Sequence, residues 1–138
     1  RVYPAIEQLL EKYPNDVNLV IKHFPLRMHK FAEKASIAAL ASAKQNKYQE
    51  LTKSLLADFK KLNNETIKKL AEANGLDMEK FNKDINDPAF KKQVQKDTKL
   101  GSSVGVRGVP ALYINGRLVK DRSLQGFSRM VEQELTKK

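Results

Sequence analysis

The sequence of 138 residues contains no cysteine and no tryptophan. Without cysteine, the chain as it stands cannot form a disulfide, a zinc–thiolate site or a thiol nucleophile. Its two histidines, His23 and His29, are too few for a histidine-rich metal site, so no metal ligands are predicted. No stretch approaches the roughly eighteen consecutive apolar residues of a membrane-spanning helix. The chain begins at Arg1 without an initiator methionine, which is typical of a processed or trimmed polypeptide.

Acidic residues are in the minority, and the formal net charge is +10. The lysines and arginines are spread along the whole chain in small pairs, such as Lys60–Lys61 and Lys91–Lys92. Aromatic residues that would stack on bases are not interleaved with these pairs. The pattern favours a solvated basic surface, and no nucleic-acid partner is predicted. Nucleic-acid binding remains the weaker alternative.

The first two segments predict a helix followed by a strand. Residues 2–13 place apolar side chains at helical spacing, and Pro4 falls where the first turn of a helix tolerates proline. Residues 17–24, VNLVIKHF, are apolar and β-branched on both faces. This pattern predicts a strand that is buried on both sides of a parallel sheet and stopped by Pro25.

From Met28 to about Leu100 the sequence predicts an almost wholly helical block. Helix starts are expected at the capping residues Asn64, Asp77 and Asp87, and a helix end at Asn74–Gly75. An apolar stripe at helical spacing is predicted to belong to the core and consists of Tyr48, Leu51, Leu55 and Phe59.

After Gly101 the pattern changes to a hairpin and a final helix. Asn115–Gly116 lies between short apolar runs and predicts a two-residue turn. Ser123 is expected to cap an amphipathic helix, whose apolar face consists of Leu124, Phe127, Val131 and Leu135.

Four stretches of the sequence resemble the DsbA-type thiol-disulfide oxidoreductases of bacteria. They read GVRGVPALYINGRLV (105–119), HFPLRMHKFAEKASIAALAS (23–42), GLDMEKF (75–81) and RVYPAIEQLLEKYP (1–14). The resemblance implies an α/β, thioredoxin-like fold with an inserted α-helical domain. It divides the chain into a first part of the core at 1–26, the helical insertion at 27–101 and a second part of the core at 102–138.

The same resemblance implies a strand and a Cys-x-x-C motif before the first helix. In this family a proline typically follows the second cysteine by five residues, so Pro4 places that cysteine two positions before Arg1. No catalytic residue is therefore expected within the chain itself. The central strand would come from residues that precede Arg1 or from another chain, because the strands beside it would otherwise leave buried main-chain groups unpaired.

Gly108, Val109 and Pro110 are the predicted substrate-binding residues. The resemblance implies a cis Val109–Pro110 bond, which would present the main chain of residue 109 to an extended substrate; the alternative is a trans proline entering an edge strand. Arg107 is expected to be a surface charge without a catalytic role. We expect His29 to pack or cap at a helix entry and His23 to be a polar group within the 17–24 strand.

The implied function is a thiol:disulfide oxidoreductase acting on the cysteines of secreted or envelope proteins, inactive in redox chemistry without its cysteines. The implied location is the periplasm or cell envelope of a bacterium, with cysteine-containing substrates and a membrane redox partner, and no organic cofactor. One alternative is a redox-inert peptide-binding module of the same fold. Another is a related fold that uses glutathione or isomerises small aromatic compounds.

Overall fold

The computed structural model describes residues 2 to 137. The chain divides into two compact units, which we call the terminal unit (residues 1–21 and 106–138) and the helical unit (residues 22–105). The sequence predicted that the helical part would span residues 27–101, whereas the helical unit spans residues 22–105. Within the described range, no helix combines the length and apolar character needed to cross a bilayer.

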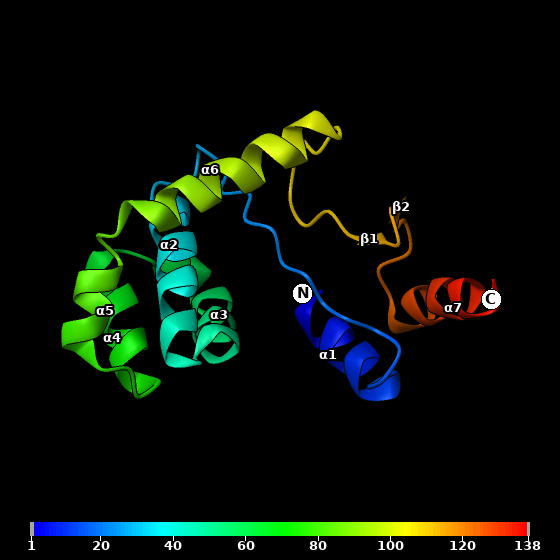
Figure 1. The fold of residues 1–138 in the computed structure, drawn as a ribbon, viewed down its shortest axis with the longest axis horizontal. Helices are drawn as coiled ribbons and strands as arrows, with labels where there is room; N and C mark the ends of the chain where they lie inside the picture. Colours follow the sequence, from blue (N-terminus) through cyan, green and yellow to red (C-terminus); the bar gives the residue numbers. More distant parts are fainter. Residues whose placement is uncertain (1, 138) are drawn as a thin grey trace. The chain divides into compact units, whose positions relative to one another are not determined.

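The helical unit consists of five α-helices and two short 3₁₀ turns. The helices are labelled α2 to α6 in Figure 1. In chain order these are α2 (Ala32–Ser42), η1 (Ala43–Gln45), α3 (Tyr48–Ala57), η2 (Phe59–Lys61), α4 (Asn64–Ala73), α5 (Met78–Asp84) and α6 (Pro88–Ser103). α2 contacts α3, α4, α5 and α6. Its buried alanines, Ala38, Ala39 and Ala41, are small enough to let these neighbours approach closely.

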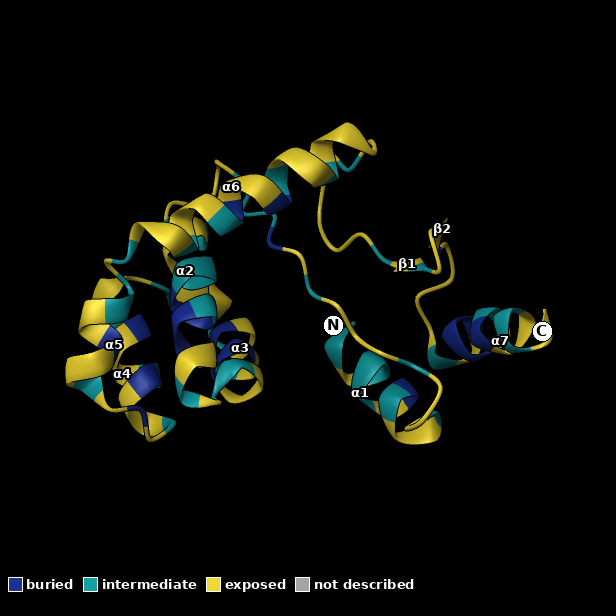
Figure 2. Cartoon of the chain, in the orientation of Figure 1, coloured by how far each residue is buried: buried dark blue, intermediate teal, exposed yellow. Residues whose placement is uncertain are grey.

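The core of the helical unit lies where α2 to α5 face one another. Phe81 and Leu51 are fully buried there, together with Leu55, Ile67 and Ala71. Figure 2 shows the buried stretches of these helices in dark blue. Tyr48 packs against this cluster, as the apolar stripe predicted. Phe59 does not, because α3 ends at Ala57 and the η2 turn that follows leaves 63% of Phe59 exposed. Its assignment to the core was wrong.

Side-chain caps define the starts of three of these helices. Asp77 accepts a hydrogen bond from the Lys80 N–H at 3.1 Å, and Asp87 accepts one from the Ala89 N–H at 2.9 Å, as the sequence predicted. For α4 the cap is Asn63, whose Oδ1 accepts from the Thr66 N–H at 2.8 Å. The prediction of Asn64 was one residue late, because Asn63 holds the extended backbone that a cap requires.

The terminal unit combines α1 (Tyr3–Lys12) and α7 (Leu124–Leu135), which pack together, with a two-stranded hairpin. Strand β1 (Tyr113–Ile114) pairs antiparallel with β2 (Arg117–Leu118), with Tyr113 opposite Leu118. Asn115 and Gly116 have φ angles of +46° and +79°, the left-handed geometry of the predicted two-residue turn. The core is formed by Leu9, Val119, Phe127 and Val131.

The strand predicted at residues 17–24 is not formed. The β1–β2 hairpin is the single sheet among residues 2 to 137, and residues 18–26 run through irregular structure. Val20 is 72% exposed, so burial on both faces is also wrong. A strand requires a neighbour to complete its hydrogen-bond ladder, and the described residues place none beside this segment.

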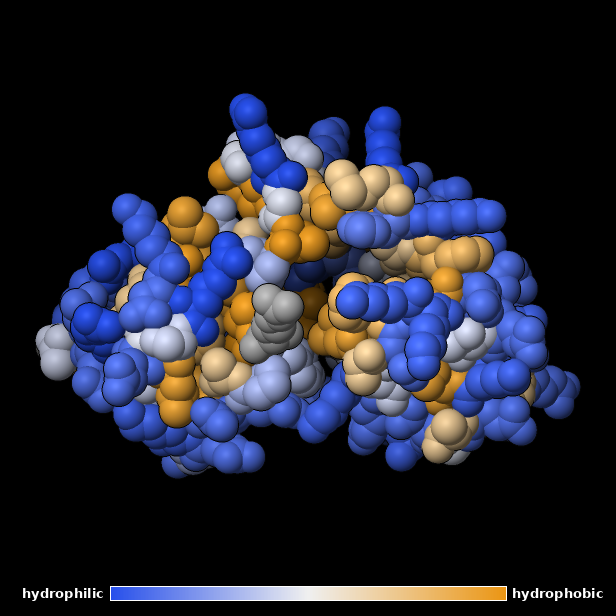
Figure 3. All heavy atoms as spheres, turned by 180° about the vertical axis from the view of Figure 1, so that it is seen from behind, coloured by the Kyte–Doolittle hydropathy of each residue, from blue (hydrophilic) through white to orange (hydrophobic). Residues whose placement is uncertain are grey.

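Large apolar side chains also remain exposed elsewhere, and apolar patches lie between hydrophilic side chains on the face drawn in Figure 3. The most exposed are Val20, Met28, Phe59 and Val104. Single exposed apolar side chains are ordinary, so none of them alone indicates a binding surface.

Ser123→Ala is expected to lower the free energy of unfolding by about 1 kcal/mol, because the cap of α7 is lost. The Ser123 Oγ accepts from the Gly126 N–H at 3.0 Å and donates to Asp121 Oδ1 at 2.7 Å. Chemical denaturation followed by circular dichroism measures the change. Ser102→Ala, at an exposed helical position, is the matched control. Equal stability of the two variants would show that the cap contributes nothing.

Candidate functional site

The predicted substrate-binding residues lie in an exposed segment of the terminal unit. Gly108, Val109 and Pro110 are all exposed and stand three residues before β1. The Val109–Pro110 peptide bond is cis. The Val109 side chain is 54% exposed, although valine is a residue type that usually lies inside.

The main chain of this segment is open to a ligand. Among the residues that the structure describes, no hydrogen bond involves the main chain of Gly108 or Val109. The chain that follows the segment is held in place, because the Val119 N–H donates to the Leu112 carbonyl at 2.8 Å. An exposed, unpaired main chain that runs into a strand can accept an extended peptide as an additional strand.

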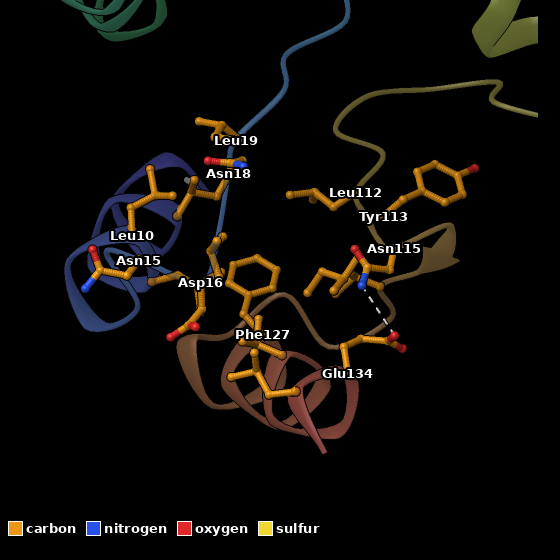
Figure 4. Close-up of a pocket in the computed structure, with 17 residues that line it drawn as sticks. Leu10, Asn15, Asp16, Asn18, Leu19, Leu112, Tyr113, Asn115, Phe127 and Glu134 are labelled. Carbon is orange, nitrogen blue, oxygen red and sulfur yellow. Dashed lines mark hydrogen bonds between the residues drawn. The ribbon is translucent and has the colours of Figure 1, made fainter. Parts of the chain in front are cut away.

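A groove of about 400 Å³ lies in the terminal unit beside the hairpin (Figure 4). One wall is formed by residues 15–19 and the other by residues 112–115. Apolar side chains of α1 and α7 complete the lining, with Phe127 directed between the two walls in Figure 4. Polar groups, including Asp16, Asn115 and Glu134, also line it. Most of the residues that line the groove are thus apolar, and two non-helical segments border it.

Glu134 of α7 fixes the tip of the hairpin. Its carboxylate accepts hydrogen bonds from Lys137 Nζ at 2.8 Å, Arg117 Nη1 at 3.2 Å and Asn115 Nδ2 at 3.4 Å. The hydrogen bond from Lys137, followed by the one from Arg117, lowers the pKa of Glu134 to about 2. The carboxylate is thus ionised at neutral pH and holds Asn115 of the turn and Arg117, the first residue of β2.

The two histidines lie in different environments. His23 is buried in the helical unit, where its Nε2 lies 2.9 Å from the Tyr48 hydroxyl. Its main-chain N–H donates to Oδ2 of the buried Asp97 at 3.0 Å. His29 is exposed, and no side chain caps the α2 N-terminus. The expectation that His29 would pack or cap was therefore wrong, and His23 is a buried polar group outside any strand.

Asp97 is held by two further groups. Gln93 Nε2 donates to Asp97 Oδ1 at 2.8 Å, and Lys22 Nζ lies 3.8 Å from the same oxygen. Burial lowers the pKa of His23 below its ordinary value of 6.5, and the Asp97 carboxylate opposes this shift only in part. His23 therefore favours the neutral form in the folded chain.

The stability of the chain is expected to decrease as the pH falls below about 6.5. The unfolded chain binds the His23 proton at a higher pH than the folded chain, so acidification favours unfolding. The stabilising effect of neutral His23 is fully present above pH 6.5 and is lost as the pH falls toward the folded-state pKa. Urea denaturation at a series of pH values measures the slope.

His23→Gln should reduce this pH dependence, and His29→Gln is the matched control. An unchanged slope in His23→Gln would contradict the assignment of the buried histidine.

Sequence reasoning missed the groove, Glu134 and Asp97. Asp97 could have been found, because it continues the helical face of Phe90 and Val94 as a charged residue at an apolar position. The groove and the bonds of Glu134 depend on residues far apart in sequence, so no local pattern indicated them. Within residues 2 to 137, the side chains bring together no cluster of three metal ligands.

The comparisons with known proteins identify the family of the chain. A family model described as thioredoxin matches residues 1–133. The chain belongs to this family, and the predicted thioredoxin-like fold is confirmed. The structure of a thioredoxin-like oxidoreductase from Silicibacter pomeroyi DSS-3 superimposes with a TM-score of 0.83 at 23% identity, covering 100% of this chain and 79% of that one.

Curated relatives are also similar, some over most of the chain and one over less than half of it. The Na(+)/H(+) antiporter NhaA 3 of Salinispora tropica is 31% identical over 115 residues, which cover 83% of this chain and 18% of the antiporter. The "Probable disulfide bond formation protein D" of Bacillus anthracis is 31% identical over 62 residues, or 45% of this chain and 28% of that protein. The chain thus spans about a fifth of the antiporters that it matches.

Proposed function

We propose that this chain is the substrate-binding part of a DsbA-type thiol:disulfide oxidoreductase that acts on the cysteines of secreted or envelope proteins. The observation that carries the proposal is the exposed, unpaired main chain of Gly108 and Val109 in a member of the thioredoxin family. An extended substrate would pair with this segment as an added strand. The similarity to a disulfide bond formation protein supports the same reaction class.

A Cys-x-x-C motif ahead of Arg1 would carry out the redox chemistry. In that position a thiolate would lie at the N-terminal end of α1, where the helix dipole favours negative charge. The groove between residues 15–19 and 112–115 is the proposed place of the central strand that leads into this motif. Its apolar lining and its two non-helical walls suit a strand rather than a helix.

The proposed setting is the bacterial periplasm or cell envelope, where disulfides form and persist. Cysteine-containing peptides are the proposed substrates, and a membrane protein would be the partner that restores the oxidised state.

Peptide binding is tested with extended, fluorescein-labelled peptides in which serine replaces cysteine. Strand pairing uses the main-chain groups of alternate residues. A peptide N-methylated on one set of alternate residues should therefore lose about tenfold in affinity, while methylation of the other set should change little. Fluorescence anisotropy with the native polypeptide, which would include the central strand, measures both. Equal effects of the two methylation patterns would exclude strand pairing.

The sequence of the native polypeptide separates redox chemistry from peptide binding alone. Two cysteines with two residues between them, ending two positions before Arg1, are expected. A native sequence without them would remove the oxidoreductase function and leave a redox-inert peptide-binding module.

A further inference from the structure

Arg107 is an unpaired cation beside the proposed substrate segment. It is exposed and stands two residues before Val109 in the same irregular stretch of the terminal unit. Among the described residues, no ion pair or hydrogen bond involves its guanidinium group. Arg117 and Arg129 of the same unit are paired, with Glu134 and Asp121 at 3.2 Å and 3.1 Å. The charge of Arg107 is thus available to a ligand.

The surrounding sequence contains no counter-charge. Between Asp97 and Asp121 there is no acidic residue, in a chain that has 16 of them. From residue 106 to residue 120, within the terminal unit, the charged residues are Arg107, Arg117 and Lys120. Because Glu134 already pairs with Arg117, the charge that this segment offers to a ligand comes from Arg107 and Lys120, and it attracts ligands of negative charge.

We propose that Arg107 makes this segment selective for peptides that carry an aspartate or glutamate near the residue that pairs with Val109. The inference rests on the proposed peptide-binding function. Residues 107 and 109 are separated by one residue, so even a fully extended chain would place them at most about 7 Å apart, which is within reach of an arginine side chain. The planar guanidinium donates two parallel hydrogen bonds to a carboxylate, a geometry that lysine does not reproduce.

The solvent exposure of Arg107 limits how strongly the segment can prefer an acidic peptide. Ion pairs in solvent contribute at most about 1 kcal/mol, which corresponds to about a fivefold difference in Kd. The preference should also decrease at high ionic strength, because added salt screens exposed charges. Arg107 is therefore a specificity-determining residue, and the main chain of residues 108 and 109 supplies the rest of the affinity.

The test compares two labelled peptides that differ only by glutamate or glutamine beside the position that pairs with Val109. The native polypeptide should bind the glutamate peptide more tightly, by up to about fivefold at low ionic strength. Arg107→Gln should abolish the difference, and Arg107→Lys should retain only part of it. Arg122→Gln is the matched control, since it removes an equal charge from an exposed arginine of the same unit.

The outcomes separate the two proposals. Binding of both peptides with equal affinity by the unmodified chain overturns the role of Arg107 and leaves peptide binding intact. An equal loss of preference in Arg107→Gln and Arg122→Gln also overturns it, in favour of a general charge effect. Binding of neither peptide refutes the proposed function, and the selectivity that rests on it falls as well.

Discussion

Phe81→Ala is expected to lower the free energy of unfolding by about 3–5 kcal/mol, the largest effect that we predict for one side chain. Phe81 is fully buried in the core of the helical unit and lies on the short helix α5. Its removal forfeits the burial of an aromatic ring and leaves a cavity, because the backbone of neighbouring helices cannot collapse fully into the space. Chemical denaturation followed by far-ultraviolet circular dichroism measures the loss.

The same substitution at Phe59 is the matched control. Phe59 is 63% exposed, so Phe59→Ala should change the stability by less than about 0.5 kcal/mol. A loss of similar size in both variants would show that Phe59 is buried and belongs to the core of the helical unit.

Gly126→Ala is expected to lower the free energy of unfolding by about 1–3 kcal/mol, although alanine is the better helix former. Gly126 lies in the first turn of α7 and is buried. A Cβ atom at this position would meet the Asp121 carbonyl oxygen and would lie 2.5 Å from Asp121 Cγ and 2.7 Å from its Cβ. The loop before α7 would have to move, which would also disturb the hydrogen bonds between Asp121 and Ser123.

Gln125→Ala provides the comparison for this prediction, because Gln125 is the exposed neighbour of Gly126 on the same helix. It should leave the stability within about 0.5 kcal/mol of the original chain. If Gly126→Ala instead raised the stability by about 1 kcal/mol, helix propensity would have decided the outcome and the close approach of Asp121 would be refuted.

Local chemistry made parts of the fold predictable from sequence. The caps at Asp77, Asp87 and Ser123 act on backbone groups two or three residues away, so a short window contains all that determines them. Asn115–Gly116 is similar, since its left-handed geometry is a property of the two residues themselves. The expected helix at residues 2–13 also forms, as α1 from Tyr3 to Lys12.

The segment at residues 17–24 could not be predicted in the same way. Its apolar, β-branched residues are compatible with a strand, but a strand exists only beside a neighbour, and neighbours are set by the whole chain. The prediction that Phe59 lies in the core was wrong for a related reason. The spacing of the apolar residues places Phe59 with them only if one helix continues through it, whereas α3 ends at Ala57.

The candidate site shows the same difference between local and distant information. Gly108, Val109 and Pro110 were identified from a contiguous stretch of sequence, and the structure places them together in an exposed segment. Glu134 was missed because its hydrogen bonds reach back to Asn115 and Arg117. The relation between these residues exists only once α7 lies against the hairpin.

The division of the chain has a consequence for its synthesis. The helical unit is one continuous stretch, residues 22–105, and its contacts can form as soon as that stretch leaves the ribosome. The terminal unit is built from two stretches on either side of the helical unit, so the apolar face of α1 is covered only after α7 has been made. Leu9 and its neighbours therefore remain open to solvent and to chaperones until α7 has been synthesised.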